Sequence, residues 1–183
     1  MDPPRRPYYR GNLPKALRAA AREILDETGR EDVGLREVTR RIGVSATAAY
    51  RHFQNKDGLL ASIAAEGFRE LAVHLEGAAA DRDPLVRTGL AYVEFALQKR
   101  GLFRLMFGPI LAARAKYPEL AAGFDLIKRI VARAAAGPSE ENAAALAAWG
   151  LIHGLSALFI DGLPEPHARS LAEEIFVRWR EAV

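Results

Sequence analysis

The stretch LREVTRRIGVSATAAYRHFQNKDGLL, residues 35–60, decides the fold that we predict for this chain. Apolar residues at helical spacing predict a short helix over residues 35–42, which Gly43 ends. Ser45 then caps a second short helix that ends near Phe53, because its hydroxyl can accept a backbone N–H. Two short helices joined by a tight turn are typical of a helix-turn-helix, whose second helix lies in the major groove of DNA.

The second short helix is built largely from small residues, which limits how it could read DNA. Its predicted core consists of Val38, Ile42, Val44, Ala49 and Phe53. The residues predicted to face outward are Ala46, Thr47, Tyr50 and Arg51. Alanines allow the helix axis to approach the bases and can touch a thymine methyl, whereas Thr47 and Arg36 would supply polar contacts. We therefore expect few direct base contacts.

The remaining sequence shows helical rather than strand periodicity, so the predicted fold class is all-α with about nine helices. The predicted helices cover residues 13–28, 35–42, 45–53, 55–79, 84–99, 102–116 with a kink at Gly108-Pro109, 118–136, 137–161 and a last segment after Pro166. We predict two domains. Residues 1–56 would form an N-terminal arm and a three-helix DNA-binding domain, and residues 57–183 a helical ligand-binding and dimerisation domain.

Composition and charge narrow the possible partners. The 183 residues include no cysteine, which excludes disulfides, thiolate metal sites and cysteine nucleophiles. Residues 1–56 hold 12 Lys and Arg against 7 Asp and Glu, whereas residues 57–183 hold 14 against 16. The first third is therefore the part expected to meet a polyanion. We expect a cytoplasmic protein, because the N-terminal residues do not resemble a secretory signal and the apolar stretch 143–160 is predicted to be a buried helix rather than a membrane span.

The motif resembles the signature of the TetR family of bacterial transcriptional regulators. The Gly-Val-Ser turn, the Tyr-x-His-Phe segment at residues 50–53 and the Asn-Lys pair at 55–56 match that signature, and PYYRGNLPKAL at 7–17 is similar to the family's entry into its first helix. YVEFALQKRGLFRLMF and AAWGLIHGL resemble a subgroup marked by a Trp, His and Gly motif. The resemblance implies a dimeric DNA-binding regulator, most simply a repressor released from a palindromic operator by a small molecule.

The resemblance also implies roles for individual residues. Tyr50, His52 and Lys56 match positions that touch DNA phosphates, and Thr47 and Arg36 match positions that can reach base edges. The full set of candidate DNA-binding residues is Arg36, Ser45, Ala46, Thr47, Tyr50, Arg51, His52 and Lys56. Alternatively, Tyr50 could pack on the first helix and His52 could cap or be buried.

One residue departs from the family pattern, and the role of the N-terminal arginines in DNA binding is open. Gly34 replaces the Thr or Ser that caps the second helix in many members, which removes one hydroxyl contact to phosphate. The N-terminal arginines Arg5, Arg6 and Arg10 could be a solvated tail or an arm that binds a groove.

The C-terminal two thirds suggest a ligand pocket. Trp149, His153 and Ser156 share one face of a predicted apolar helix, and buried polar groups need partners that a ligand could supply. The candidate pocket residues are Tyr92, Phe95, Phe103, Met106, Phe107, Trp149, His153 and Ser156. A core histidine bonded to a backbone carbonyl is the alternative, and aromatic residues at helical spacing often only fill a core.

A second face suggests a dimer interface, because small residues allow another backbone to approach closely. The candidate interface residues are Gly150, Gly154, Ala157, Leu171, Ile175, Phe176 and Trp179, in a four-helix bundle across a two-fold axis. Packing of the same faces within one chain is the alternative.

The expected partners are therefore a double-stranded DNA operator, a small apolar or amphipathic effector and a second copy of the chain, without a membrane. No cofactor or metal is expected. A helical enzyme or an interaction scaffold without an operator is the alternative function, but the sequence shows no phosphate loop, nucleophile elbow or HExxH motif.

Overall fold

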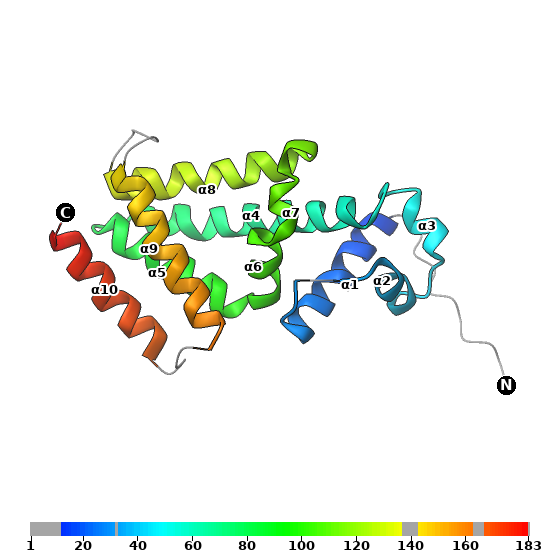
Figure 1. The fold of residues 1–183 in the computed structure, drawn as a ribbon, viewed down its shortest axis with the longest axis horizontal. Helices are drawn as coiled ribbons and strands as arrows, with labels where there is room; N and C mark the ends of the chain where they lie inside the picture. Colours follow the sequence, from blue (N-terminus) through cyan, green and yellow to red (C-terminus); the bar gives the residue numbers. More distant parts are fainter. Residues whose placement is uncertain (1–11, 32, 137–142, 163–166, 183) are drawn as a thin grey trace.

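The computed structural model describes residues 12–31, 33–136, 143–162 and 167–182, and every regular element within these ranges is helical. Figure 1 shows an elongated molecule, in which a small group of N-terminal helices is joined to a larger bundle by one long helix. The predicted all-α class, with an N-terminal helix-turn-helix domain and a C-terminal helical domain, is confirmed.

Three helices form the N-terminal group, and their ends follow the capping residues expected from the sequence. They are α1 (Leu13–Thr28), α2 (Leu35–Arg41) and α3 (Ala46–Tyr50). Asn12 Oδ1 accepts the N–H of Lys15 at 3.1 Å, and Gly29 ends α1 with a φ of 63°. Ser45 Oγ accepts the N–H of Ala48 at 3.2 Å. Each side-chain bond satisfies an N–H that the first turn of a helix leaves unpaired.

The core of the helix-turn-helix is the predicted one. Val38, Ile42, Ala49 and Phe53 are buried, and Val44 is half-buried. The third helix is shorter than expected, because α3 ends at Tyr50 and the N–H groups of His52 and Phe53 both bond to the Ala49 carbonyl. This tight turn still brings the Phe53 ring into the core.

The long helix α4 (Lys56–Ala79) runs from the N-terminal group into the bundle (Figure 1). Asn55 caps it by accepting the N–H of Gly58 at 2.8 Å. Its buried residues extend from Leu59 to Leu75, so one helix contributes to the packing of both domains. A domain division after residue 56 therefore stays a prediction.

The C-terminal domain contains more, shorter elements than the sequence predicted. They are α5 (Pro84–Gln98), α6 (Arg100–Phe107), α7 (Pro109–Ala112), η1 (Arg114–Lys116), α8 (Pro118–Ala136), α9 (Ala143–Ile160) and α10 (Ala168–Ala182). The prediction of a single kinked helix over residues 102–116 is wrong. Gly108 is extended, with φ −82° and ψ −163°, and Pro109 has no N–H to continue α6, so three elements replace it. The residues predicted to open the eighth helix, 137–142, lie outside the described residues.

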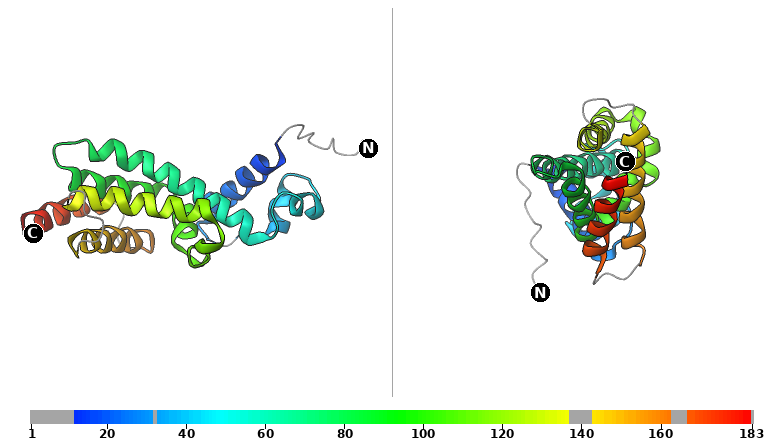
Figure 2. Two further views of the ribbon diagram at one scale, coloured as in Figure 1. Left: turned by 90° about the horizontal axis from the view of Figure 1, so that it is seen from above. Right: turned by 90° about the vertical axis from the view of Figure 1, so that its left-hand side faces the viewer.

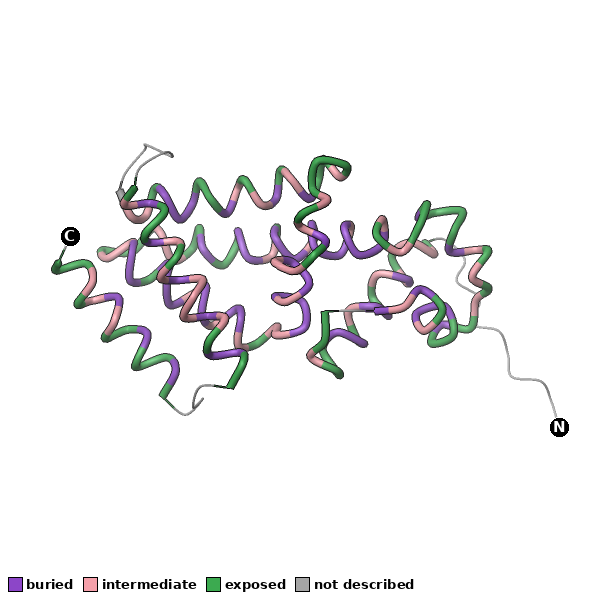
Figure 3. The backbone as a smooth tube through the Cα atoms, viewed as in Figure 1, coloured by how far each residue is buried: buried purple, intermediate pink, exposed green. Residues whose placement is uncertain are grey.

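The bundle is arranged around α5. Figure 2 shows α8 alongside α4, and α5 packs against α4, α9 and α10. The largest fully buried side chains include Phe68, Tyr92, Phe103, Phe159 and Phe176. In Figure 3 the buried residues follow α4 and α5, whereas α3 and α10 are exposed along much of their length.

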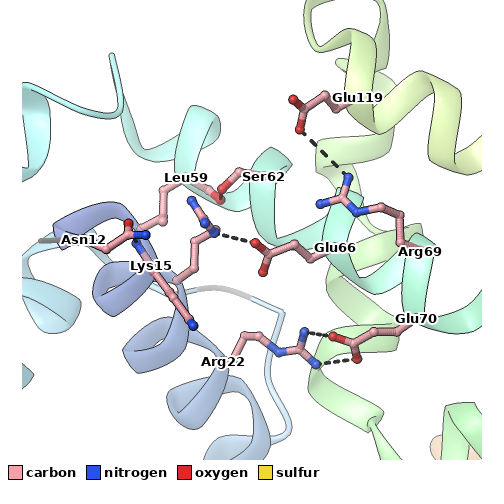
Figure 4. Close-up of polar contacts among 10 residues, drawn as sticks. Asn12, Lys15, Arg22, Leu59, Ser62, Glu66, Arg69, Glu70 and Glu119 are labelled. Carbon is pink, nitrogen blue, oxygen red and sulfur yellow. Dashed lines mark hydrogen bonds and ion pairs between the residues drawn. The ribbon is translucent and has the colours of Figure 1, made fainter.

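Two ion pairs join α1 to α4 (Figure 4). Arg18 Nε lies 2.5 Å from Glu66 Oε1, and Arg22 binds both carboxylate oxygens of Glu70, with Nη2 at 2.8 Å from Oε2. Both arginines and both glutamates are spaced four residues apart, so each helix presents two charges on one face. Two parallel ion pairs therefore fix the rotation of α1 relative to α4.

A second junction joins α1 to α6 and to the end of α9. Arg104 on α6 donates from Nη1 to the Gly29 carbonyl at 2.7 Å and from Nη2 to the Ile160 carbonyl at 2.8 Å. It also contacts Asp161 Oδ1 at 2.8 Å. Both carbonyls lie at helix C-termini, where a cation is favoured by the helix dipole. One guanidinium group thus holds the ends of two helices from different parts of the chain.

The helix α9 is long and apolar enough to cross a membrane by length and composition, with a mean hydropathy of 1.8. A core helix of a soluble protein passes the same test. The sequence predicted a buried helix, but only 33% of this window is buried within one chain. Its exposed side is apolar, with Leu146 and Leu158 among the exposed residues.

Candidate functional site

The exposed side of α3 is the candidate surface for DNA. Thr47, Tyr50 and Arg51 are exposed and Ala46 is half-buried. The Tyr50 side chain is 53% exposed, which disfavours the alternative that it packs on α1. Figure 1 shows α3 at the end of the molecule farthest from the C-terminal bundle. The short helix is therefore accessible to a duplex without a clash from the bundle.

The candidate phosphate contacts lie at the end of α3 and the start of α4. His52 is exposed, which disfavours a buried role, and Lys56 is half-buried in the first turn of α4. The hydroxyl of Ser45 is engaged in capping α3, so its contact to DNA would use the same group. An ammonium group beside a helix N-terminus favours an anion through two additive effects.

The helix α2 contributes further cations. Gly34 is its N-cap without a side-chain bond, as the sequence indicated, and Arg36 is exposed. Arg40, one turn later on the same face, is also exposed and was not among the predicted residues. The four-residue spacing from Arg36 is the signal that could have identified it. Arg41 instead binds Glu27, with Nη2 at 2.6 Å from Oε2, which places it in the packing of α1 on α2.

Four of the predicted pocket residues form one aromatic cluster inside the C-terminal domain. Tyr92 comes from α5, Phe103 and Phe107 from α6, and His153 from α9. The His153 ring stacks on Phe103 with centroids 5.5 Å apart and lies 4.6 Å from the Phe107 centroid. Tyr92 Oη lies 3.1 Å from His153 Nδ1. Residues far apart in the sequence thus converge on one polar pair surrounded by aromatic rings.

The Tyr92–His153 pair is electrically neutral at physiological pH. Burial raises the pKa of the Tyr92 phenol well above its ordinary value, and burial lowers the pKa of His153. We assign the phenol as donor, because a phenol O–H is a stronger acid than a neutral imidazole N–H. The imidazole then carries its proton on Nε2 and offers that N–H as a donor.

We expect the lowered pKa of His153 to make stability pH-dependent. Because the unfolded chain takes up a proton near pH 6.5 more readily than the folded one, stability is lost as pH falls below about 6.5. Between pH 7.5 and pH 5.5, thermal unfolding should show a smaller loss of Tm for His153→Gln than for the unmodified chain. The glutamine keeps a hydrogen-bond acceptor but does not titrate. An equal loss in the variant and the unmodified chain would contradict this assignment.

The other predicted pocket residues lie around the cluster rather than in it. Phe95 packs beside His74, with centroids 5.8 Å apart, and Met106 is fully buried. Ser156 is fully buried and donates to the Ile152 carbonyl at 2.8 Å, so α9 satisfies it without a ligand. Trp149 packs against Phe124 of α8.

An open cavity of about 240 Å³ lies between α8 and α9. It is lined by Phe124, Lys128, Ala132, Ala145, Leu146 and Trp149. Of the predicted pocket residues, Trp149 alone is among this lining. The lining does not include Tyr92 or His153, whose rings contact those of Phe103 and Phe107.

The exposed face of α9 has small residues at its centre. At about 100° per residue, Gly150, Gly154 and Ala157 lie between Leu146 and Leu158 on the helix surface. Leu146 is 75% and Leu158 54% exposed. A methyl group added to Gly150 or Gly154 would meet no atom of the chain within 4 Å. This face is apolar and is not covered by the chain itself.

The predicted interface residues of α10 divide between two sides. Leu171 is 44% exposed, and Ile175 and Trp179 are half-buried. Phe176 is only 1% exposed and packs on Gly89 of α5, where a methyl group would lie 2.8 Å from the ring. Phe176 therefore belongs to the core of one chain. The helical spacing of the apolar residues of α10 could not distinguish a residue of this core from a residue of an interface.

Within the described ranges, no group of three or more His, Asp or Glu side chains is placed to hold a metal ion. The arrangement instead combines an exposed helix-turn-helix with a helical domain that contains an aromatic cluster and an uncovered apolar face. This combination defines the class of protein as a DNA-binding transcription regulator with a separate helical domain.

Two family descriptions match the chain. Residues 17–63 match "Bacterial regulatory proteins, tetR family", and residues 85–178 match "Tetracyclin repressor-like, C-terminal domain". The chain belongs to the TetR family of bacterial regulatory proteins. The resemblance noted in the sequence is confirmed at this level, and the subgroup stays a prediction.

Solved structures share the fold over most of the chain. A protein with unknown function from a Rhodococcus species is 29% identical, with a TM-score of 0.73, and the match covers 94% of this chain and 97% of that one. The TetR family transcriptional regulator PfmR from Thermus thermophilus is 20% identical, with a TM-score of 0.64 and coverage of 87% and 94%. A TetR transcriptional regulator from a Rhodococcus species is 21% identical, with a TM-score of 0.61 and coverage of 87% and 91%. No curated protein matches the chain.

Proposed function

We propose that the protein is a cytoplasmic, non-enzymatic repressor that binds a palindromic operator as a homodimer and is released by a small effector. The exposed helix-turn-helix at the far end of the molecule is the observation that carries this proposal. Genome-wide selection of bound fragments by the purified protein tests it. A salt-sensitive, two-fold symmetric site is the expected result, and absence of any sequence preference would contradict it.

The DNA contacts that we propose divide into base and phosphate contacts. Arg36 and Thr47 are exposed and reach base edges, with α3 in the major groove. Tyr50, His52 and Lys56 contact phosphates, and Arg40 adds a cation on the face of Arg36. The small side chains of α3 then act by allowing a close approach to the groove floor.

Substitution of Arg36 and Lys56 should have different effects on operator binding. Arg36→Ala is expected to lose about 1–3 kcal/mol of discrimination at one base pair. Lys56→Ala should weaken binding to all DNA sequences alike, and it should lower the slope of log affinity against log salt concentration by about one. Gel-shift titrations on the operator and on single-base variants, at several salt concentrations, measure both effects. Equal, sequence-independent losses would refute the role given to Arg36.

The dimer that we propose uses the exposed face of α9 and the exposed residues of α10. Leu146, Leu158 and Leu171 are large apolar side chains left in contact with solvent by a single chain. Burying them between two copies would remove an apolar surface that soluble monomers rarely leave exposed. Gly150 and Gly154 would let two α9 helices approach closely across a two-fold axis.

The effector that we propose binds at the aromatic cluster around Tyr92 and His153. The neutral polar pair suits an uncharged molecule with a hydrogen-bond acceptor for His153 Nε2–H, and the rings of Phe103 and Phe107 suit an apolar body. The 240 Å³ cavity beside Trp149 offers a path from solvent. A ligand entering from there would move Phe107, which is only half-buried.

Release from the operator then follows from the difference in ligand affinity between two dimer geometries. Two α3 helices must lie about 34 Å apart to enter successive major grooves. An effector that favours another spacing weakens operator binding by its differential affinity for the two states, and about 1.4 kcal/mol of that difference corresponds to tenfold.

A further inference from the structure

The N-terminal helices are attached to the bundle both at α4 and at α6. The helix α4 runs through both parts of the molecule, and its ion pairs with α1 fix the rotation of that helix. The helix α6 lies between α1 and α9 (Figure 1), and a methyl group on Gly101 would lie 2.7 Å from the Leu25 carbonyl carbon of α1. A single long helix can bend, whereas two attachments at different places fix an orientation.

Arg104 supplies polar contacts at the α6 attachment. Its guanidinium group donates to the Gly29 carbonyl at 2.7 Å and to the Ile160 carbonyl at 2.8 Å, and Nη2 also lies 2.8 Å from Asp161 Oδ1. The side chain is 31% exposed, so water competes for these bonds only in part. A guanidinium group is planar, and its donors have fixed directions. It therefore holds the end of α1 in one position relative to the end of α9.

The two helix ends that Arg104 joins belong to the two proposed binding surfaces. The helix α9 carries the exposed apolar face, which includes Gly150. The helix α1 supports the helix-turn-helix, because Arg41 of α2 binds both carboxylate oxygens of Glu27, at 2.7 and 2.6 Å. These bonds and Arg104 thus link the proposed dimer face to α2 and α3. In a two-fold dimer any rotation of α1 in one protomer is repeated in the other, so both α3 helices move.

We propose that Arg104 determines which half-site spacing the protein binds, by fixing α1 and the helix-turn-helix relative to α9. The proposal rests on the dimer and the operator proposed above, but it needs no effector. One extra base pair between the half-sites moves the second half-site by about 3.4 Å and rotates it by about 35°. A helix-turn-helix held by Arg104 does not follow that change, whereas one attached through α4 alone follows it by bending of α4.

Spin labels within one protomer test whether Arg104 fixes α1. The chain contains no cysteine, so Thr47→Cys on α3 and Arg133→Cys on α8, both exposed, provide one label pair. Pulsed electron paramagnetic resonance on labelled chain diluted with unlabelled chain measures the distance distribution. Arg104→Met is expected to broaden or shift this distribution, and Arg104→Lys, which keeps the charge but not the planar fork, should do so less. An unchanged distribution in Arg104→Met would overturn the proposal, and where that variant does not fold, Arg104→Lys carries the same test.

Affinities for operators of different spacing provide the second readout. The unmodified chain is expected to bind an operator with one extra central base pair at least about tenfold more weakly, and Arg104→Met less than about threefold more weakly. A variant that is merely less stable would bind both operators less tightly by the same factor, so this ratio would not change. Arg82→Met removes an exposed arginine between α4 and α5 and should retain both the ratio and the label distance. An unchanged ratio in Arg104→Met would overturn the proposal.

The two measurements distinguish failure of this proposal from failure of the proposed function. The label distance needs neither a dimer nor an operator. If no operator is found, the proposed function fails, and the label distance still shows whether Arg104 fixes α1. If an operator is found and Arg104→Met discriminates spacing as the unmodified chain does, the role given to Arg104 fails alone.

Discussion

Replacement of Gly150 by arginine is expected to convert the proposed dimer to a monomer and to lower affinity for the proposed operator by about 10²-fold or more. Gly150 lies at the centre of the exposed apolar face of α9. The chain leaves open space there, so Gly150→Arg should not disturb the fold of one protomer. It would place a charged side chain between two closely packed helices. The loss of affinity follows because each monomer would then bind its half-site alone, without the high effective concentration that a linked second protomer provides.

Light scattering after size exclusion, and gel-shift titration on the proposed palindromic operator, together measure this effect. Gly77→Arg is the matched control, because Gly77 is also exposed on a helix and also has open space around it. The control should remain dimeric and bind the operator normally. A dimeric Gly150→Arg variant with unchanged affinity would contradict the proposed interface.

Replacement of Gly101 by alanine is expected to lower the free energy of unfolding by about 3 kcal/mol. A methyl group on Gly101 would lie 2.7 Å from the carbonyl carbon of Leu25 and closer still to its oxygen. Both contacts are with backbone atoms near the end of α1, so no side-chain rotation relieves them. The substitution must therefore push α6 away from α1.

Thermal and urea unfolding measure this effect, with a loss of roughly 6–12 °C in Tm expected for a chain of this length. Gly77→Ala is the matched control, since its methyl group would meet no atom within 4 Å. Alanine is the better helix former, and the control should gain about 0.5–1 kcal/mol. A Gly101→Ala variant as stable as the unmodified chain would show that α1 and α6 separate without loss.

The elements set by local chemistry could be predicted from the sequence. Asn12, Ser45 and Asn55 each cap the helix that was expected to follow them, because capping depends on residues within one turn. At Gly108 the sequence predicted only a kink, whereas the helix ends there. The backbone angles of a Gly-Pro pair depend on what packs around it, and the sequence does not show this. There, Glu31 and the Arg104 carbonyl occupy the space beside the glycine.

The candidate sites were predictable in composition but not in arrangement. Helical periodicity grouped Phe176 with Leu171 and Trp179, yet Phe176 is buried on α5 and Leu171 faces solvent. A period of 3.6 defines an apolar stripe without identifying which neighbour covers each part of it. A cavity of about 400 Å³ lined in part by Glu31 and Ile110 was not predicted, because these residues are brought together only by the packing of α6 and α7 against the N-terminal helices.

The bonds from Arg104 to the ends of α1 and α9 have a consequence for synthesis of the chain. Arg104, which binds the carbonyl of Gly29 at the end of α1, lies on α6, 75 residues later in the chain. The same guanidinium also binds the carbonyl of Ile160 at the end of α9. The ion pairs between α1 and α4 need only residues up to Glu70, so the Arg104 contacts are the later of the two junctions to form. We therefore expect this junction to be completed only after residue 160 has been synthesised, because Arg104 then has both of its carbonyl partners.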